Sequence, residues 1–194
     1  MITSVMARVD IKKIMGIALL AISPTAFAQS QNFEGVGVSL DYGLFAIKDK
    51  STPGSSITSN SGIPAVTLDY YHAVTDKVLL GGYFTYDLVS SDTYGSDPDA
   101  QHPMELGAKA AYAVTDSLIG YVKLGYAWTR FSSPGFYQIM RGPAFGIGAE
   151  YLWTKNIFTR VEIARQNYKQ VNWSDGTADK VNIDSYTVSV GYRF

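Results

Sequence analysis

The chain has 194 residues, a formal net charge of −1 and no cysteine. Disulfide scaffolds and thiolate zinc sites are therefore excluded, and no basic excess is present that would bind nucleic acid. Only 17% of the residues are charged, whereas Gly (18) and Tyr (14) are abundant, which suits a β protein with apolar surface better than a helical protein.

The N-terminus has the three parts of a secretory signal peptide. Arg8, Lys12 and Lys13 precede a short apolar run at 14–22, and the small-residue site Ala26-Phe27-Ala28 follows. The apolar run is too short to span a bilayer. We therefore expect residues 1–28 to be removed on export, whether translation starts at Met1 or Met6. The mature domain is then 29–194, beginning with a short polar leader at 29–34.

From Val36 onward, apolar and polar side chains alternate in segments bounded by turn-forming residues. Alternation with period two predicts strands with one apolar and one polar face. Eight strands are predicted, at about 36–44, 64–73, 78–89, 104–113, 118–130, 143–153, 157–168 and 183–194.

The predicted connections alternate between short and long. Three related turn segments, Ala73–Asp76, Ala113–Asp116 and Leu152–Lys155, recur at intervals of about 40 residues. Long loops are expected at 48–62, 90–103, 131–141 and 169–182. Eight antiparallel strands with short turns at one end and long loops at the other are typical of an outer-membrane barrel.

Three features indicate that the apolar face of these strands meets lipid. That face carries almost no charge between residues 36 and 164, while the opposite face is rich in small residues; large aromatic residues gather towards the strand ends. A soluble barrel would turn its apolar face inward, whereas lipid requires an apolar exterior on a closed barrel. The predicted fold is all-β: an eight-stranded antiparallel transmembrane β-barrel in the outer membrane of a Gram-negative bacterium.

The closing strand places Tyr186, Val188, Val190, Tyr192 and Phe194 on one face. We expect those side chains to meet lipid, and the strand to pair with residues 36–44 and close the barrel.

Several segments resemble a known family. Gly142–Tyr151, Phe158–Glu162 and Ala110–Asp116 resemble strands and a turn of the OmpA transmembrane domain, and the ending Val190–Phe194 is similar to that of OmpX. The resemblance implies a small outer-membrane barrel of the opacity-like porin family. It also implies that Tyr192 and Phe194 form a signal for the barrel assembly machinery, and that outer-membrane lipids and lipopolysaccharide surround the protein. Because the sequence ends at Phe194, no peptidoglycan-binding domain is expected.

The inward face of the predicted barrel carries charged residues of both signs. The acids are Asp41, Asp69, Glu105, Glu150 and Glu162, and the bases are Lys109, Lys123, Arg160 and Arg193. Charges in a narrow interior must pair or neutralise. We therefore expect an ion-pair network that plugs the lumen, as the resemblance also implies. The alternative is a narrow porin-like channel for ions or small solutes, lined by the same residues.

Catalysis has little support in the sequence. His72 lies beside a turn, and His102 shares a predicted loop with Ser90, Ser91 and Asp92, which is the one candidate set for a lipid A-modifying enzyme. Loops are rich in Ser and Asp for conformational reasons, so we expect a non-enzymatic protein. No phosphate-binding loop or metal-ligand spacing occurs, so neither cofactor nor metal is expected.

The long loops are then the expected interaction surface, for host or other surface ligands. Aromatic contacts could come from Phe131, Phe136, Tyr137, Tyr168 and Trp173, with Pro134 among them; the same side chains could instead rest on lipopolysaccharide. Arg130, Arg141, Arg165 and Lys169 could pair with lipopolysaccharide phosphates or simply snorkel at the interface. The expected role is structural, in envelope integrity, with possible adhesion.

Overall fold

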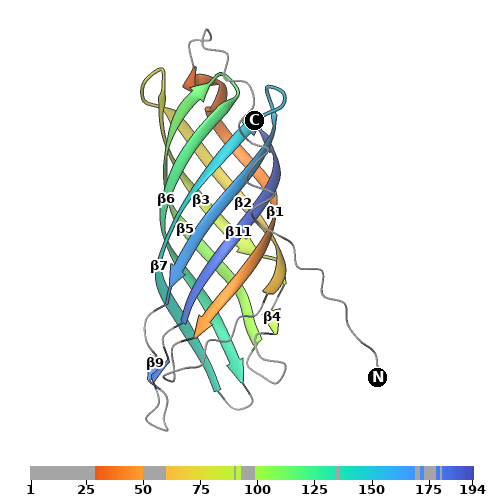
Figure 1. The fold of residues 1–194 in the computed structure, drawn as a ribbon, viewed down its shortest axis with the longest axis vertical. Coiled ribbons are helices and arrows are strands. Elements are labelled where there is room, and N and C mark those ends of the chain that lie inside the picture. Colours follow the sequence, from red (N-terminus) through yellow and green to blue (C-terminus); the bar gives the residue numbers. More distant parts are fainter. Residues whose placement is uncertain are drawn as a thin grey trace, which may run out of the picture.

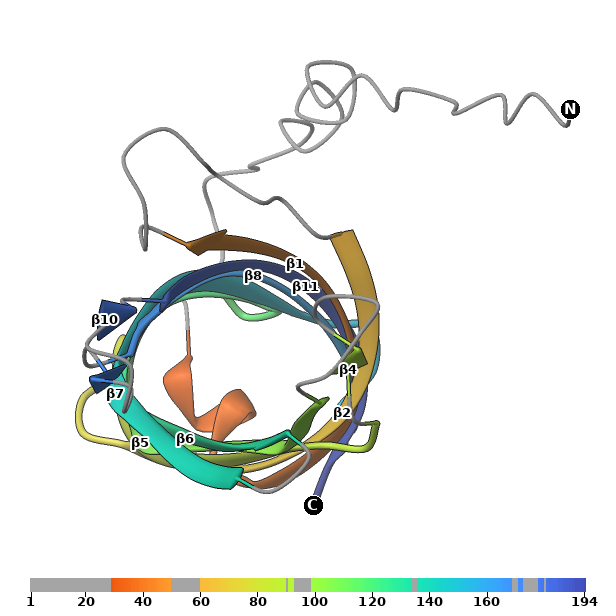
Figure 2. The same ribbon diagram turned by 90° about the horizontal axis from the view of Figure 1, so that it is seen from below.

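A computed structural model describes residues 29–49, 60–89, 91–92, 99–133, 136–168, 171–172, 178–179 and 181–194. The predicted signal peptide lies outside the described residues. Eight long strands form a closed antiparallel barrel (Figures 1 and 2): β1 (Gly35–Asp49), β2 (Asn60–Ala73), β3 (Val78–Asp87), β5 (Asp99–Thr115), β6 (Leu118–Ser133), β7 (Phe136–Leu152), β8 (Ile157–Asn167) and β11 (Val181–Arg193). The smaller described elements are a 3-10 helix, η1 (Ser30–Phe33), and the two-residue strands β4 (Ser91–Asp92), β9 (Val171–Asn172) and β10 (Ala178–Asp179). In the described part of the chain, no helix is long and apolar enough to cross a membrane.

The barrel closes where the sequence predicts. β1 pairs with β11 in the antiparallel register Val38↔Tyr192 to Leu44↔Tyr186, and β3 pairs directly with β5. Every long strand thus has two neighbours, and the ladder has no free edge that lipid would leave unsatisfied.

The predicted alternation of inward and outward side chains is confirmed. On β6, Leu124 is 66% exposed on the outer face, whereas its neighbour Lys123 is 8% exposed in the interior. The same alternation continues on β11, where Val188 and Val190 point outward and Ser189 is buried. The exterior is therefore an apolar belt suited to lipid.

The three short connections share one hydrogen-bonding device, which explains why their sequences recur. In the first turn, the Thr75 hydroxyl accepts from the amides of Lys77 and Val78, at 3.3 and 3.0 Å. Thr115 accepts from the Ser117 amide, and Thr154 accepts from the two corresponding amides of its own turn. A threonine hydroxyl thus satisfies amides that the strand ladder leaves free at each turn.

At the opposite end the strands run further than predicted. The expected long loop at 131–141 is wrong, because β6 and β7 keep pairing from Phe131↔Gln138 to Ser133↔Phe136. β5 likewise starts at Asp99, and its pairing with β6 shifts register between Gln101 and Met104. That irregularity accommodates Pro103, which has no amide to donate to a regular ladder.

The polar leader at 29–34 contains an ordered element that its sequence pattern does not predict. η1 lies inside the ring of strands (Figure 2), at the end that carries the short turns. Ser30 and Phe33 are fully buried there. The half-buried Glu34 continues the segment to β1, and its Oε1 lies 2.8 Å from His72 Nδ1.

Candidate functional site: the charged interior of the barrel

The nine charged residues predicted for the interior all lie on the inward face, and eight of them take part in ion pairs. The exception is Asp41, whose carboxylate accepts from the hydroxyls of Ser39 and Thr67, at 2.8 and 2.5 Å. The ion pairs form two clusters along the barrel axis. We call them the turn-side cluster (Asp69, Lys109, Glu150, Arg160 and Arg193) and the loop-side cluster (Glu105, Lys123 and Glu162).

The turn-side cluster places two carboxylates among three cations. Asp69 on β2 pairs with Arg160, with Lys109 at 3.3 Å and with Arg193 at 3.3 Å. Glu150 lies between the two arginines, 2.8 Å from Arg160 Nη2 and 2.7 Å from Arg193 Nη2. These residues come from five strands, and Glu150 and Arg193 are 0% and 1% exposed. The ion pairs of this cluster therefore link five of the eight long strands across the lumen.

Aromatic rings surround the same cations. Lys109 Nζ lies 5.0 Å from the Tyr121 ring centroid and 5.2 Å from that of Tyr83. The guanidinium groups of Arg160 and Arg193 lie 5.0 and 5.1 Å from the Phe158 centroid. Cation–π contacts of this length stabilise desolvated cations. The cluster has three cations but only two carboxylates, and the aromatic rings provide additional stabilising contacts to the cations.

The loop-side cluster is centred on Lys123. Its ammonium lies 3.0 Å from Glu105 and 2.6 Å from Glu162. Tyr83 and Tyr121 donate their hydroxyls to these two carboxylates, at 2.5 and 2.7 Å respectively. Each carboxylate thus has an ammonium group and a phenol hydroxyl as partners. Buried charged groups need such hydrogen-bond partners to offset the loss of water.

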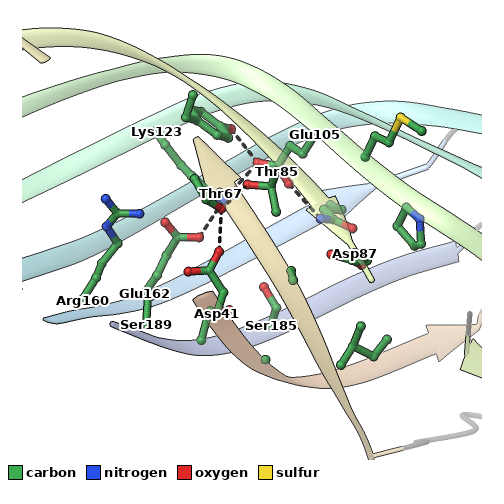
Figure 3. A pocket seen from close by; sticks show the side chains of 18 of the residues that line it. Asp41, Thr67, Thr85, Asp87, Glu105, Lys123, Arg160, Glu162, Ser185 and Ser189 are labelled. Atoms are coloured by element: carbon green, nitrogen blue, oxygen red, sulfur yellow. Dashed lines mark hydrogen bonds and ion pairs between the residues drawn. The ribbon is translucent and has the colours of Figure 1, made fainter. Parts of the chain in front are cut away.

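A cavity of about 50 Å³ lies beside these ion pairs (Figure 3). Asp41, Thr67, Thr85 and Asp87 line it, together with the loop-side cluster and with Lys109 and Arg160 of the turn-side cluster. A space of this size holds at most a few water molecules. Asp87 is an interior acid beyond the predicted set, and its parity on β3, which matches that of Tyr83 and Thr85, is the signal that identifies it.

Between the turn-side cluster and the short turns lies an apolar layer that alternation does not predict. Leu79, Ile119, Leu152 and Phe158 are buried there against Phe33 of η1. The signal was hidden because Leu79 and Ile119 stand beside the apolar residues Leu80 and Leu118, so alternation does not mark them as inward. The remaining members of the layer are Tyr71, Ala111, Ala113 and Tyr121.

Two glycines leave room for this packing. A β-carbon at Gly37 would overlap Asp69 Oδ1 and crowd the Arg193 guanidinium, and one at Gly148 would overlap the Tyr121 ring. Small inward residues therefore allow the large charged and aromatic side chains to cross the axis.

Little of the candidate catalytic set is described. Ser90 and the side chains of Ser91, Asp92 and His102 lie outside the described residues. Among the residues that are described, no group of three or more His, Cys, Asp or Glu side chains could hold a metal ion.

The predicted loop contacts have mixed outcomes. The sequence predicts Tyr168 as a surface aromatic, and this prediction is wrong. The residue is 1% exposed and donates its hydroxyl to Gln166 Oε1 at 3.0 Å. Arg165 pairs with Asp184 through two contacts, at 2.5 and 2.9 Å. The side chains of Phe131, Phe136 and Tyr137, and the residues Pro134, Lys169 and Trp173, lie outside the described part of the chain.

Arg130 and Arg141 lie on the outer face of β6 and β7, towards the loop end. Trp128 faces Arg141 and Ile139 faces Arg130 across the strand pair, so the two arginines are diagonal neighbours. They border a groove of about 600 Å³ whose other lining residues are Tyr86, Met104, Tyr126, Trp128, Thr129 and Ile139. No carboxylate among the described residues pairs with either arginine.

Comparisons with known proteins agree with this architecture. The crystal structure of Ail, the attachment invasion locus protein of Yersinia pestis, superposes with a TM-score of 0.56 at 17% identity, covering 83% of this chain and 99% of that one. Neisserial surface protein A superposes with a TM-score of 0.54 at 14% identity, covering 83% of this chain and 98% of that one. A search of curated protein sequences found no significant match. The family profile described as "Outer membrane protein beta-barrel domain" matches residues 15–194, and the chain therefore belongs to this family of outer-membrane barrels.

Proposed function

We propose that this protein is a non-enzymatic outer-membrane barrel with a sealed lumen, which supports envelope integrity and presents its loop end as an interaction surface. The observation that carries the proposal is the stack of side-chain layers inside the barrel. From the loop end to the turn end these are the loop-side cluster, the turn-side cluster, the apolar layer and η1.

The ion pairs argue against a channel for ions or small solutes. A conducting pore needs binding sites weak enough for an ion to leave. Here Arg160, Arg193 and Lys109 are held by carboxylates and rings from several strands, and a passing solute would have to separate buried partners. Breaking a buried pair costs about 3–5 kcal/mol, and a solute would then have to pass a mostly apolar layer on the turn side.

Solute uptake into liposomes tests the sealed scaffold against the porin alternative. Refolded protein is incorporated into liposomes, which are then diluted into isosmotic solutions of small sugars or amino acids. We expect swelling at the rate of protein-free liposomes. Swelling that increases with the amount of folded protein would support the porin alternative instead.

The lipid A-modifying alternative is tested in cells. Lipid A from strains with and without the protein is compared by mass spectrometry. The proposal predicts identical acyl and phosphate patterns, together with greater sensitivity of the strain without the protein to detergents and bile salts. A lipid A species that depends on the protein would contradict the non-enzymatic assignment.

We propose that the groove beside Arg130 and Arg141 holds the phosphorylated headgroup of a lipopolysaccharide molecule. Three observations support this partner. The groove lies at the loop end, which in this family of barrels faces the outside; its two guanidinium groups lack protein partners among the described residues; and Tyr126 and Trp128 suit the boundary between acyl chains and headgroups. The related protein Ail has been crystallised with a heparin analogue, sucrose octasulfate, so a barrel of this fold has been observed with a polyanion.

The paired Arg165 provides a matched control for this site, because Asp184 already occupies its guanidinium group. We expect the double variant Arg130→Ala/Arg141→Ala to retain about tenfold less lipopolysaccharide during purification, the loss expected for charge-assisted contacts. Arg165→Ala should retain as much as the wild type. Equal retention in all three proteins, or equal binding of dephosphorylated lipopolysaccharide, would exclude a phosphate site in the groove.

A further inference from the structure

η1 is bound by the two turns that share the sequence Val-Thr-Asp. In the turn between β2 and β3, the Thr75 carbonyl accepts the Ser30 hydroxyl at 2.5 Å, and the Asp76 carbonyl accepts the Ser30 amide at 2.8 Å. In the turn between β5 and β6, the Asp116 carbonyl accepts the Asn32 side-chain amide at 3.1 Å. The recurring turns thus form a binding site for the leader, in addition to connecting strands.

One of these contacts involves the first residue after the predicted cleavage site. The Gln29 backbone nitrogen donates to Asp116 Oδ1 at 3.0 Å. If the signal peptide is removed after Ala28, this nitrogen becomes the α-ammonium group of the mature protein. The hydrogen bond from an uncharged amide then becomes an ion pair, because an ammonium group replaces the amide beside the same carboxylate.

We infer that Asp116 is a binding site for the α-ammonium group of the mature chain, and that signal peptide cleavage thereby fixes η1 in the turn end of the barrel. The inference rests on the predicted cleavage site and is independent of whether the lumen conducts. The rest of η1 supports it, because Ser30 and Phe33 are already buried and direct Gln29 towards Asp116.

The same pairing has a chemical consequence. An N-terminal glutamine cyclises when its unprotonated α-amine attacks the side-chain carbonyl carbon, forming a new C–N bond and releasing the side-chain nitrogen as ammonia. A neighbouring carboxylate favours the protonated amine, which cannot attack. Asp116 should therefore slow the conversion of Gln29 to pyroglutamate, which would remove the charge.

The repeat supplies a matched control. Asp76 stands at the same position of the first turn as Asp116 does in the second, and binds η1 through its backbone carbonyl only among the contacts described. Asp76→Asn and Asp116→Asn thus remove the same charge from equivalent turns, but only the second should weaken the terminal ion pair.

The test measures amide hydrogen exchange at Ser30 and Glu34, both bonded in the docked segment, in refolded protein that begins at Gln29. We expect exchange about fivefold faster in Asp116→Asn, as for loss of an exposed ion pair, and unchanged in Asp76→Asn. In a chain with Gly-Ser added before Gln29, Asp116→Asn should have little further effect. Mass spectrometry should show faster pyroglutamate formation in Asp116→Asn than in Asp76→Asn.

Three results would overturn the inference. The first is a mature protein from cells whose N-terminus is not Gln29. The second is an equal effect of the two substitutions, which would indicate general turn electrostatics. The third is an equal effect of Asp116→Asn in the mature and extended chains, which would show that the carboxylate binds the backbone amide irrespective of the terminal charge.

Discussion

Buried charged side chains are stabilised by different contacts in the two halves of the lumen. On the turn side, Glu150 and Asp69 form ion pairs with arginines, and aromatic rings and an apolar layer pack around these pairs. On the loop side, Glu105 and Asp87 border a small polar cavity, and hydroxyl groups provide much of the hydrogen bonding. The turn side therefore depends on its ion pairs and rings, whereas the loop side has room for water to compensate a missing partner.

The largest difference should appear when one carboxylate is removed from the turn side. Glu150→Ala leaves Arg160 and Arg193, which are 3% and 1% exposed, without their shared partner. We expect the free energy of unfolding to fall by about 3–5 kcal/mol, the usual cost of breaking a buried ion pair. Urea unfolding in lipid vesicles, followed by tryptophan fluorescence, measures this. A loss below about 1 kcal/mol would place the arginines in contact with water.

The equivalent change on the loop side should cost less. In Glu105→Gln, Lys123 keeps Glu162 as its partner and the cavity lies alongside. We expect a loss of about 1–3 kcal/mol, the range for an imperfectly replaced hydrogen bond to a charged group. The same unfolding assay applies. A loss equal to that of Glu150→Ala would remove the distinction between the two halves.

At the turns themselves the effects should be smaller again. Thr154→Ala removes a hydroxyl that accepts from the amides of Asn156 and Ile157. Because these amides are exposed to water, we expect a loss of about 0.5–1.5 kcal/mol. Thr154→Ser keeps the hydroxyl and should retain most of the stability. If serine and alanine are equally destabilising, the threonine methyl group rather than the hydroxyl sets the turn.

At the outer surface of the loop end we expect the smallest effect. Arg165 is half exposed in its pair with Asp184. Exposed ion pairs contribute little to stability, so Arg165→Ala should leave the urea midpoint unchanged. A clear shift of the midpoint would show that this rim is as tightly organised as the turn side.

Much of this arrangement follows from alternation alone. The parity of each strand placed Lys109, Lys123 and Arg160 in the interior, and the last strand was matched correctly to β1. Parity does not determine which interior residues meet, because that depends on strand tilt and stagger around the barrel. Asp69 and Arg193, on β2 and β11, are thus neighbours that no local pattern identifies.

Two further features could not be read from the sequence for physical reasons. Leu79 and Ile119 are inward residues flanked by outward apolar ones, so the period-two signal vanishes where the apolar layer forms. The leader has no long periodic pattern, and η1 is ordered by the turns and by the burial of Phe33 rather than by its own propensity.

Conductance across planar lipid bilayers tests the sealed lumen most directly. The refolded protein is added at high salt, and single-channel current is recorded with heat-denatured protein as the control. The two ion-pair clusters and the apolar layer predict a current no different from that control. Stable, reproducible conductance steps that require the folded barrel would contradict the sealed lumen and establish a pore.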